Sequence, residues 1–236
     1  MRSIRTFLVL FALAFLSAAR VSAAILTGSV APPPASVNLT TEGLSDWIHW
    51  GLNNASDVDR KITGLSQISN FTTIGAGTTV VRLTDSPSKA SWIDGTPDLT
   101  VTNTPSGVYI NNFDGPARGF MFTVPADILS RVLKVYVGEF EASGTLTATL
   151  SDNSAPAYSQ TLAGSANGTV QSVYTINYAA ASLGQTLTIK WTETADLGTA
   201  DNITLQSADL SLAGVPEPTT LVLLAGASIM LLRRRK

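Results

Sequence analysis

Two glutamates in this 236-residue chain, Glu139 and Glu141, are spaced for hydrolytic chemistry. A pair of carboxylates can cleave a glycosidic bond, one acting as acid and the other as nucleophile. Residues two apart on a strand share a face, so this spacing predicts positions suited to both roles. The competing interpretation is a pair of solvated charges at a strand end. The chain has one histidine, His49, and no cysteine, GxSxG or HExxH motif, so no nucleophile-and-base set is evident. We therefore expect no enzyme, with a carboxylate-dependent glycoside hydrolase as the alternative.

A second group of residues is aromatic and suits sugar binding. In DWIHWG, an extended chain places Trp47 and His49 on one face and Trp50 on the other. Trp92, next to Asp94, is flanked by Ser, Lys, Gly and Pro, which predicts a loop. An exposed tryptophan can stack on a sugar while a nearby carboxylate takes its hydroxyls. The candidate carbohydrate-binding residues are Trp47, His49, Trp50, Trp92 and Asp94. Alternatively, the tryptophans fill the core and mouth of a sandwich.

Two acidic stretches, NNASDVD and DLGTADN, contain oxygen ligands of the kind that calcium needs. Calcium takes six to eight oxygens, and neither stretch matches a known calcium-loop pattern. Turn chemistry is the commoner explanation for such stretches. We therefore expect no cofactor and assign no metal ligand, while structural calcium remains open without support from a motif.

The elements that must position these residues are short strands. β-branched and aromatic runs are separated by Gly, Asn, Asp, Ser and Pro throughout the central part of the chain. GTLTATLSD and LTIKWTET alternate apolar and polar residues, which indicates one dry and one wet face. PADILSR suggests a single helical turn. The expected strands are Trp47–Trp50, Thr79–Leu83, Gly107–Asn111, Gly119–Val124, Arg131–Phe140, Gly144–Leu150, Val173–Tyr178, Thr186–Thr192 and Asn202–Leu212.

This pattern predicts an all-β domain over residues 37–214. Nine short strands indicate a two-sheet antiparallel β-sandwich, and we favour a jelly roll over an immunoglobulin-like sandwich because the domain is too long for one immunoglobulin unit. Residues 24–36, which contain three consecutive prolines, are expected to be a flexible lead-in.

The domain is acidic although the whole chain has a formal charge of only −2. Residues 25–214 carry eight Lys and Arg against sixteen Asp and Glu, a net charge of −8. This balance argues against nucleic acid as a partner. Without cysteine there is no disulfide, but about 190 residues are enough for one sizeable core.

The beginning of the chain has the layout of a signal peptide. Arg2 and Arg5 precede an apolar run from Phe7 to Leu16, and small residues follow. We expect residues 1–23 to be removed by signal peptidase, with cleavage after Ala23 or Ala24.

The last 22 residues, 215–236, contain three features in order. Val215-Pro216-Glu217-Pro218 resists helix formation because of its two prolines. Residues 219–232 are uncharged and would form a helix of about 21 Å, short for a bilayer core of roughly 30 Å. Arg233, Arg234, Arg235 and Lys236 then act as a cytoplasmic stop.

This arrangement resembles the PEP-CTERM sorting signal of Gram-negative bacteria. The resemblance implies recognition by an exosortase near Pro216–Pro218 and a host that produces exopolysaccharide. It also implies export across the inner membrane to the cell surface or extracellular matrix, with the short helix holding the chain in the membrane before processing. The alternative is an ordinary C-terminal anchor.

A second resemblance covers Val37 to Leu212. The segments LTTEGLSDWIHWGL, RKITGLSQISNF, SWIDGTP, VPADILSRVLKVYVGEFEASGTLTATLSD and YTINYAAASLGQTLTIKWT are similar to a recurrent domain of secreted bacterial proteins with a galactose-binding-like jelly roll. The resemblance implies a fold and a setting but no assigned activity.

Three hypotheses follow for function. The first is a non-catalytic surface or matrix protein that binds exopolysaccharide weakly. The second is a purely structural surface protein without a defined ligand. The third is the carboxylate-dependent hydrolase.

Overall fold

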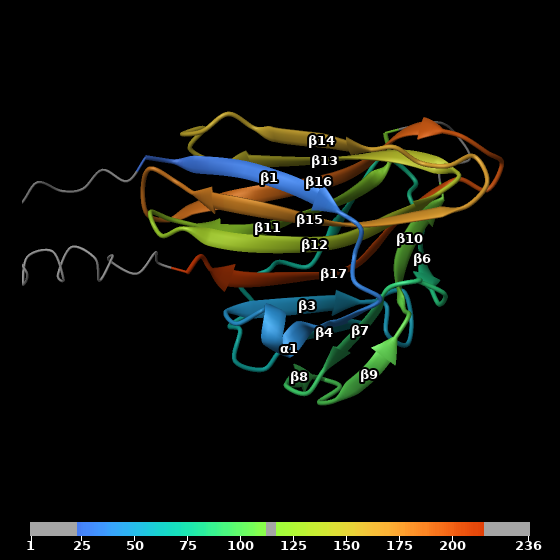
Figure 1. Cartoon of the computed structure of the whole chain (residues 1–236), viewed down its shortest axis with the longest axis horizontal. Coiled ribbons are helices and arrows are strands. Elements are labelled where there is room, and N and C mark those ends of the chain that lie inside the picture. Colours follow the sequence, from blue (N-terminus) through green and yellow to red (C-terminus); the bar gives the residue numbers. More distant parts are fainter. Residues whose placement is uncertain (1–22, 112–116, 215–236) are drawn as a thin grey trace, which may run out of the picture.

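The computed structural model describes residues 23–111 and 117–214, and almost all of its regular structure is β (Figure 1). The expected all-β class is therefore confirmed. The expected signal peptide up to Ser22, the motif Val215–Pro218 and the basic residues Arg233–Lys236 lie outside the described residues. Within the described ranges, no helix has the length and apolar character needed to span a bilayer.

The larger sheet has nine strands, and antiparallel pairs join them. Its main path is β1-β15-β12-β17-β3-β4-β8, and β10 branches from β17 and pairs with β6. The bounds are β1 Ile25–Ala31, β15 Thr169–Ala179, β12 Arg131–Phe140, β17 Asn202–Leu212, β3 Asp46–Trp50, β4 Val58–Lys61, β8 Gly95–Thr96, β10 Gly107–Asn111 and β6 Val80–Leu83.

The second sheet has five strands in the order β14-β13-β16-β11-β5. Their bounds are β14 Tyr158–Leu162, β13 Ala142–Leu150, β16 Gln185–Asp196, β11 Gly119–Ala126 and β5 Thr72–Ile74. From β10 to β13 and again from β14 to β17, successive strands belong to opposite sheets. This crossing from sheet to sheet gives the two-sheet jelly-roll sandwich that the sequence predicts.

The core lies between the two sheets, and strand alternation fills it. In β13 every second residue is buried, including Leu146, Ala148 and Leu150, as the period of two predicts. The same alternation buries Leu187, Ile189 and Trp191 of β16 in this main core.

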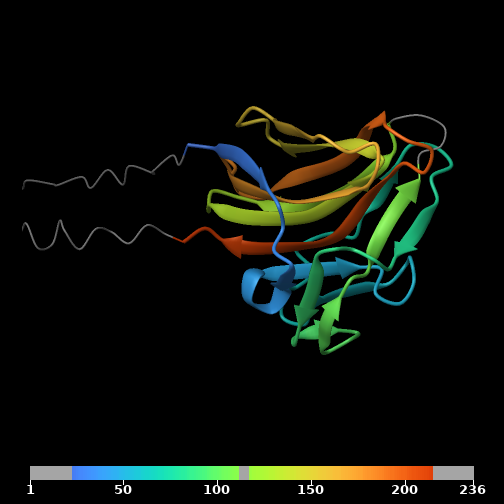
Figure 2. The ribbon, with the colours of Figure 1, turned by 45° about the vertical axis from the view of Figure 1, so that its right-hand side comes forward.

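A small third sheet covers part of the outer face of the nine-stranded sheet, the face away from the main core. It consists of β2 (Ser36–Asn38), β7 (Lys89–Trp92) and β9 (Val101–Thr104), with the parallel pair β2–β7 and the short helix α1 (Leu39–Glu42) beside it. Figure 2 shows β7, β9 and α1 on the side of β3 and β17 that is remote from β13 and β14. A second core cluster forms underneath: Val37, Leu39, Trp47, Ala90, Trp92 and Tyr136.

Two local predictions are wrong. The expected flexible lead-in contains β1, which pairs with β15 from Ile25 opposite Ala179 to Ala31 opposite Val173. Leu26 packs against the main core, and the three prolines begin only after the strand. The expected helical turn in PADILSR is not formed, because Pro125 and Ala126 end β11 and pair with β16.

Candidate functional site

Strand β3 divides its aromatic residues between two cores, as the DWIHWG pattern predicts. Ile48 and Trp50 belong to the main core, and Trp47 belongs to the second cluster on the opposite face. Both tryptophans have no exposed surface, so neither ring face is open to a ligand.

Trp47, His49 and Trp92 pack together with Asp94, and we call these four residues the aromatic knot. The ring centroids of Trp47 and Trp92 are 5.1 Å apart, and those of His49 and Trp92 are 5.0 Å apart. The expectation that Trp92 lies exposed in a loop is wrong, because it ends β7 and is fully buried. Sequence reasoning thus found residues that do assemble, but they assemble as a core.

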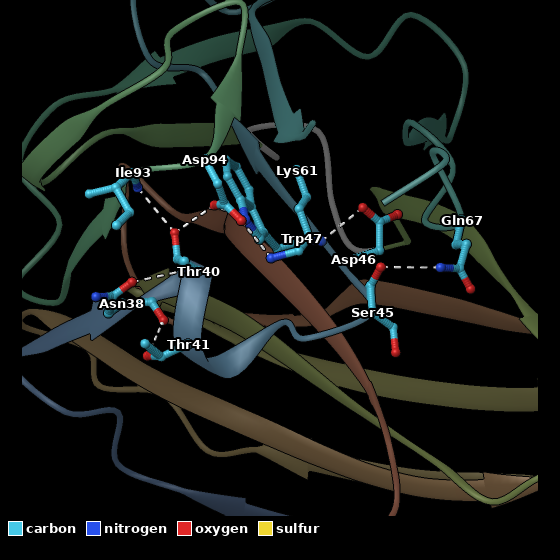
Figure 3. Close-up of polar contacts among 10 residues, drawn as sticks. All are labelled: Asn38, Thr40, Thr41, Ser45, Asp46, Trp47, Lys61, Gln67, Ile93 and Asp94. Atoms are coloured by element: carbon cyan, nitrogen blue, oxygen red, sulfur yellow. Dashed lines mark hydrogen bonds and ion pairs between the residues drawn. The ribbon is translucent and has the colours of Figure 1, made fainter. Parts of the chain in front are cut away.

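Asp94 is the polar centre of the knot (Figure 3). Its Oδ1 accepts from Thr40 Oγ1 at 2.5 Å and from Trp47 Nε1 at 3.0 Å, and Lys61 Nζ donates to Oδ2 at 2.6 Å. Burial opposes ionisation of Asp94, but these hydrogen bonds outweigh burial and lower its pKa. The carboxylate is therefore already engaged by three internal donors.

The indole nitrogens of Trp92 and Trp50 are also paired. Trp92 Nε1 donates to the carbonyl of Asp98 at 2.8 Å, and Trp50 Nε1 donates to Asn70 Oδ1 at 2.8 Å. His49 Nε2 lies 3.2 Å from the carbonyl of Ser106, while its Nδ1 is buried without a hydrogen-bond partner among the described residues. Burial lowers the pKa of His49 to about 4, so the imidazole is neutral at pH 7 and the knot is a buried structural unit.

The two glutamates proposed for hydrolysis serve different local structures. Glu139 is fully buried, Gly144 N donates to its Oε2 at 2.8 Å, and burial raises its pKa to about 8. Strand β12 ends at Phe140, and Glu141 follows with a φ of 50°, so the two glutamates do not share a strand face as predicted. Glu141 Oε2 instead accepts from Thr199 N and Ala200 N, both at 3.1 Å, and holds the loop between β16 and β17.

A pocket of about 430 Å³ opens where the small sheet leaves the outer face of the nine-stranded sheet uncovered. We call it the outer-face pocket. Strand register places its residues in two rows across four neighbouring strands. Asn111, Asn202, Phe140 and Thr169 form one row, and Tyr109, Thr204, Gly138 and Gln171 form the other. Directly paired residues point to the same face of a sheet, so these side chains converge on the outer surface.

Gly138 lies at the middle of the second row. A Cβ at this position would stand 2.7 Å from Thr204 Oγ1 and 3.1 Å from Gln171 Cγ. A side chain at this position would therefore collide with its neighbours, and glycine allows Thr204 and Gln171 to pack close together in this row.

The polar wall of the pocket is fixed in place by neighbouring loops. Gln171 accepts from Ser88 N through Oε1 at 2.8 Å and donates from Nε2 to Ser86 Oγ at 2.6 Å. Arg82 donates from Nε to the carbonyls of Gly51 and Leu52 at 3.1 and 2.9 Å. These bonds hold the amide and the guanidinium before any ligand arrives.

Tyr109 is one of the two aromatic residues that line the pocket, the other being Phe140. It is half-buried on β10, with Val108 and Ile110 on the opposite, core-facing side. Among residues 23–111 and 117–214, no hydrogen-bond partner or ring contact engages the phenol of Tyr109. The ring can therefore meet a ligand without losing an internal interaction, in contrast to the tryptophans.

Sequence reasoning missed this pocket. Its residues come from segments between Arg82 and Thr204, and none forms a local motif. The only local signal was alternation in GVYIN, where a tyrosine and an asparagine stand on the face opposite to Val108 and Ile110.

The fold and the pocket define a β-sandwich with an open, polar and aromatic depression on one sheet. No family model matches the chain, and no curated protein matches its sequence.

Several solved carbohydrate-binding modules share a distant likeness to the chain. TmCBM61 in complex with β-1,4-galactotriose has 14% identity and a TM-score of 0.39, covering 63% of this chain and 92% of that one. The CBM22-1 xylan-binding domain from Paenibacillus barcinonensis Xyn10C has 11% identity and a TM-score of 0.37, covering 71% and 94%. CBM36 in complex with calcium and xylotriose has 12% identity and a TM-score of 0.31, covering 60% and 99%. At such scores these likenesses assign neither a ligand nor a site.

Proposed function

We propose that this domain binds a neutral oligosaccharide in the outer-face pocket without catalysing a reaction on it. The observation that carries the proposal is the ring of Tyr109, which no described residue engages, in a row with the hydroxyl of Thr204 and the amide of Gln171. An aromatic face covers the apolar side of a sugar, while fixed polar groups receive its hydroxyls. A volume of about 430 Å³ lies within the usual range for small-ligand sites.

The affinity of one pocket should be low. A single aromatic ring on an open surface supports a Kd near 1 mM, about −4 kcal/mol. Many copies of the protein acting on many repeats of one polymer would retain it through avidity. An exopolysaccharide, the polymer that the sorting-signal resemblance implies for the host, is therefore a better partner than a free monosaccharide.

The test compares two variants of Tyr109. We expect Tyr109→Ala to lower affinity about tenfold, because the stacking surface is lost, and Tyr109→Phe to keep most of the affinity. A glycan array of neutral oligosaccharides selects the ligand. Affinity electrophoresis in gels containing host exopolysaccharide and calorimetric titration then measure both variants.

Thermal unfolding is the control, because a half-buried surface tyrosine should leave the melting temperature nearly unchanged. If wild-type protein is not retarded by any neutral polymer, the purely structural surface protein becomes the better interpretation. Equal binding by wild type and Tyr109→Ala would show that a bound sugar occupies another place.

The proposed setting is the bacterial cell surface or extracellular matrix, after export across the inner membrane. It is supported by the signal-peptide pattern and by the order of Val215–Pro218, apolar segment and Arg233–Lys236 in the sequence. Processing by signal peptidase and by an exosortase should remove both ends. Mass spectrometry of the mature protein from its native host tests this, and an intact RRRK terminus on the abundant surface form would refute the sorting step.

A further inference from the structure

Three carboxylates meet where β16 passes into β17. Glu193 lies near the end of β16, Asp196 is its last residue, and Asp201 immediately precedes β17. One oxygen from each lies within 4.8 Å of the others, and the described part of the chain contains one group of this kind. We call these three residues the acidic cluster.

Two members of the acidic cluster are buried without a hydrogen-bond partner. Glu193 is 1% exposed and Asp201 is 3% exposed. Within residues 23–111 and 117–214, neither oxygen of the Glu193 carboxylate nor Oδ2 of Asp201 receives a hydrogen bond. Buried carboxylates are normally paired, because desolvating an unpaired charge is costly. This arrangement therefore needs a proton or a cation, and no side chain among the described residues donates a hydrogen bond to these oxygens.

The closeness of the three carboxylates leads to the same requirement. At neutral pH the cluster must bind protons or a cation, because three like charges this close repel one another.

We propose that the acidic cluster binds a calcium ion. All three side chains offer carboxylate oxygens and none offers nitrogen or sulfur, which favours a hard cation over a transition metal. Three carboxylates can supply part of the six to eight oxygens that calcium requires, and backbone carbonyls and water can complete the shell. Calcium is favoured over magnesium because it accepts irregular geometry, and the three ligands come from strand ends joined by a loop.

The loop that connects the ligands is already ordered. Besides the two hydrogen bonds to Glu141 Oε2, Leu197 N donates to the carbonyl of Glu141 at 2.8 Å. This anchoring shapes the loop without using the acidic cluster. Ala200 and Asn202, on either side of Asp201, line the outer-face pocket. The proposed calcium site consists of residues outside the pocket lining, so calcium binding does not require that the pocket bind a sugar.

The experiment titrates the full-length chain, freed of metal with a chelator, with calcium chloride. Calorimetry should show one calcium per chain with a Kd of about 0.1–1 mM, the range of extracellular calcium modules. At 100 times the Kd, calcium should raise the melting temperature by about 5 °C or more, and magnesium should raise it less.

Three variants locate the site. The calcium-dependent shift in melting temperature should disappear in each of Glu193→Gln, Asp201→Asn and Asp196→Asn. Because Asp196 is exposed, its variant tests the site without disturbing the core. The matched control is Asp57→Asn in the other acidic stretch, where Asn53 N and Asn54 N already donate to the aspartate. This control should keep the full shift.

Absence of a calcium-dependent shift in wild type would overturn the proposal and leave shared protons as the way the cluster is neutralised. A shift that persists in Asp196→Asn and in a folded Glu193→Gln or Asp201→Asn variant would equally overturn it, because calcium would then bind elsewhere.

Discussion

The aromatic knot and the outer-face pocket occupy neighbouring parts of the same outer sheet face. Each combines aromatic rings with carboxylate, amide or hydroxyl groups. The knot is covered by the small sheet, its rings are buried, and Asp94 has three internal donors. The pocket lies beyond that cover, Gly138 lets Thr204 and Gln171 pack close together beside it, and no residue in 23–111 or 117–214 engages the ring of Tyr109. The difference lies in whether the aromatic rings are covered, since the residue types are alike and polar groups in both regions are hydrogen-bonded within the fold.

The boundary between the two regions is itself built from hydrogen bonds. Gln206 Nε2 donates to the carbonyls of Ser88 and Ser106 at 3.0 and 3.2 Å, and Ser88 N donates to Gln171. Residues near Ser88 thus complete the cover of the knot on one side and the wall of the pocket on the other. An aromatic residue near polar groups can mark a binding surface only where the fold leaves its ring face uncovered.

The largest expected effect distinguishes the two regions by stability. Trp92→Ala should lower the free energy of unfolding by about 3–5 kcal/mol, because it leaves a cavity in the second core. Tyr109→Ala should change it by about 0.5 kcal/mol or less. Urea denaturation of both variants provides the comparison. Similar losses in the two variants would contradict the distinction between a closed knot and an open pocket.

A second test uses pH and the buried imidazole of the knot. Burial lowers the pKa of His49 from 6.5 to about 4, so the unfolded chain binds the proton more readily than the folded one. Titration of His49 therefore leaves the free energy of unfolding unaffected above pH 6.5. As pH falls from 6.5 toward 4, protonation of His49 in the unfolded chain lowers the free energy of unfolding by roughly 3 kcal/mol.

Buried carboxylates such as Glu139 and Glu193 have raised pKa values and change stability in the opposite direction over this range, so the test compares wild type with His49→Gln by denaturation at several pH values. His49→Gln keeps a donor near Ser106 and lowers stability by itself, but its stability relative to wild type should improve as pH falls from 6.5 to 4. A stability difference that stays constant over this pH range would assign the acid sensitivity to other groups.

A smaller effect is expected at Asp94. Asp94→Asn should lower the free energy of unfolding by about 1.5–3 kcal/mol, because the hydrogen bonds from Lys61, Thr40 and Trp47 would no longer end on a charged carboxylate. The pKa of Asp94 is lowered in the fold, so this contribution is present at neutral pH and disappears as pH falls through that pKa. The loss on substitution should therefore be smaller in acid. A neutral variant as stable as wild type at pH 7 would mean that the knot does not depend on its carboxylate.

The long strands could be predicted because their patterns are local. The expected bounds of β12 and β17 agree with the structure, and alternation assigned Trp47 and Trp50 to opposite faces. Trp92 could not be placed in this way. Its neighbours resemble a turn, and β7 is a four-residue strand that depends on pairing with β2 and β9.

The pocket and the acidic cluster could not be predicted from the sequence, for a different reason. Gly138 matters because Thr204 and Gln171 lie beside it, and neither partner is near it in the chain. The stretch DLGTADN indicated oxygen ligands, but Glu193 precedes that stretch and its burial without partners is a tertiary property. Spacing alone cannot show which carboxylates the fold leaves unsatisfied.

Strand register also fixes how the domain would be presented to its surroundings. Ile25 pairs with Ala179, and Leu212 pairs with Arg131, which itself pairs with Tyr178, so both described chain ends leave from one end of the sandwich (Figure 1). The row of Asn111, Asn202, Phe140 and Thr169 lies at the other end of these strands. A domain tethered through either terminus would therefore hold its pocket outward, at the far tip of the molecule from its point of attachment.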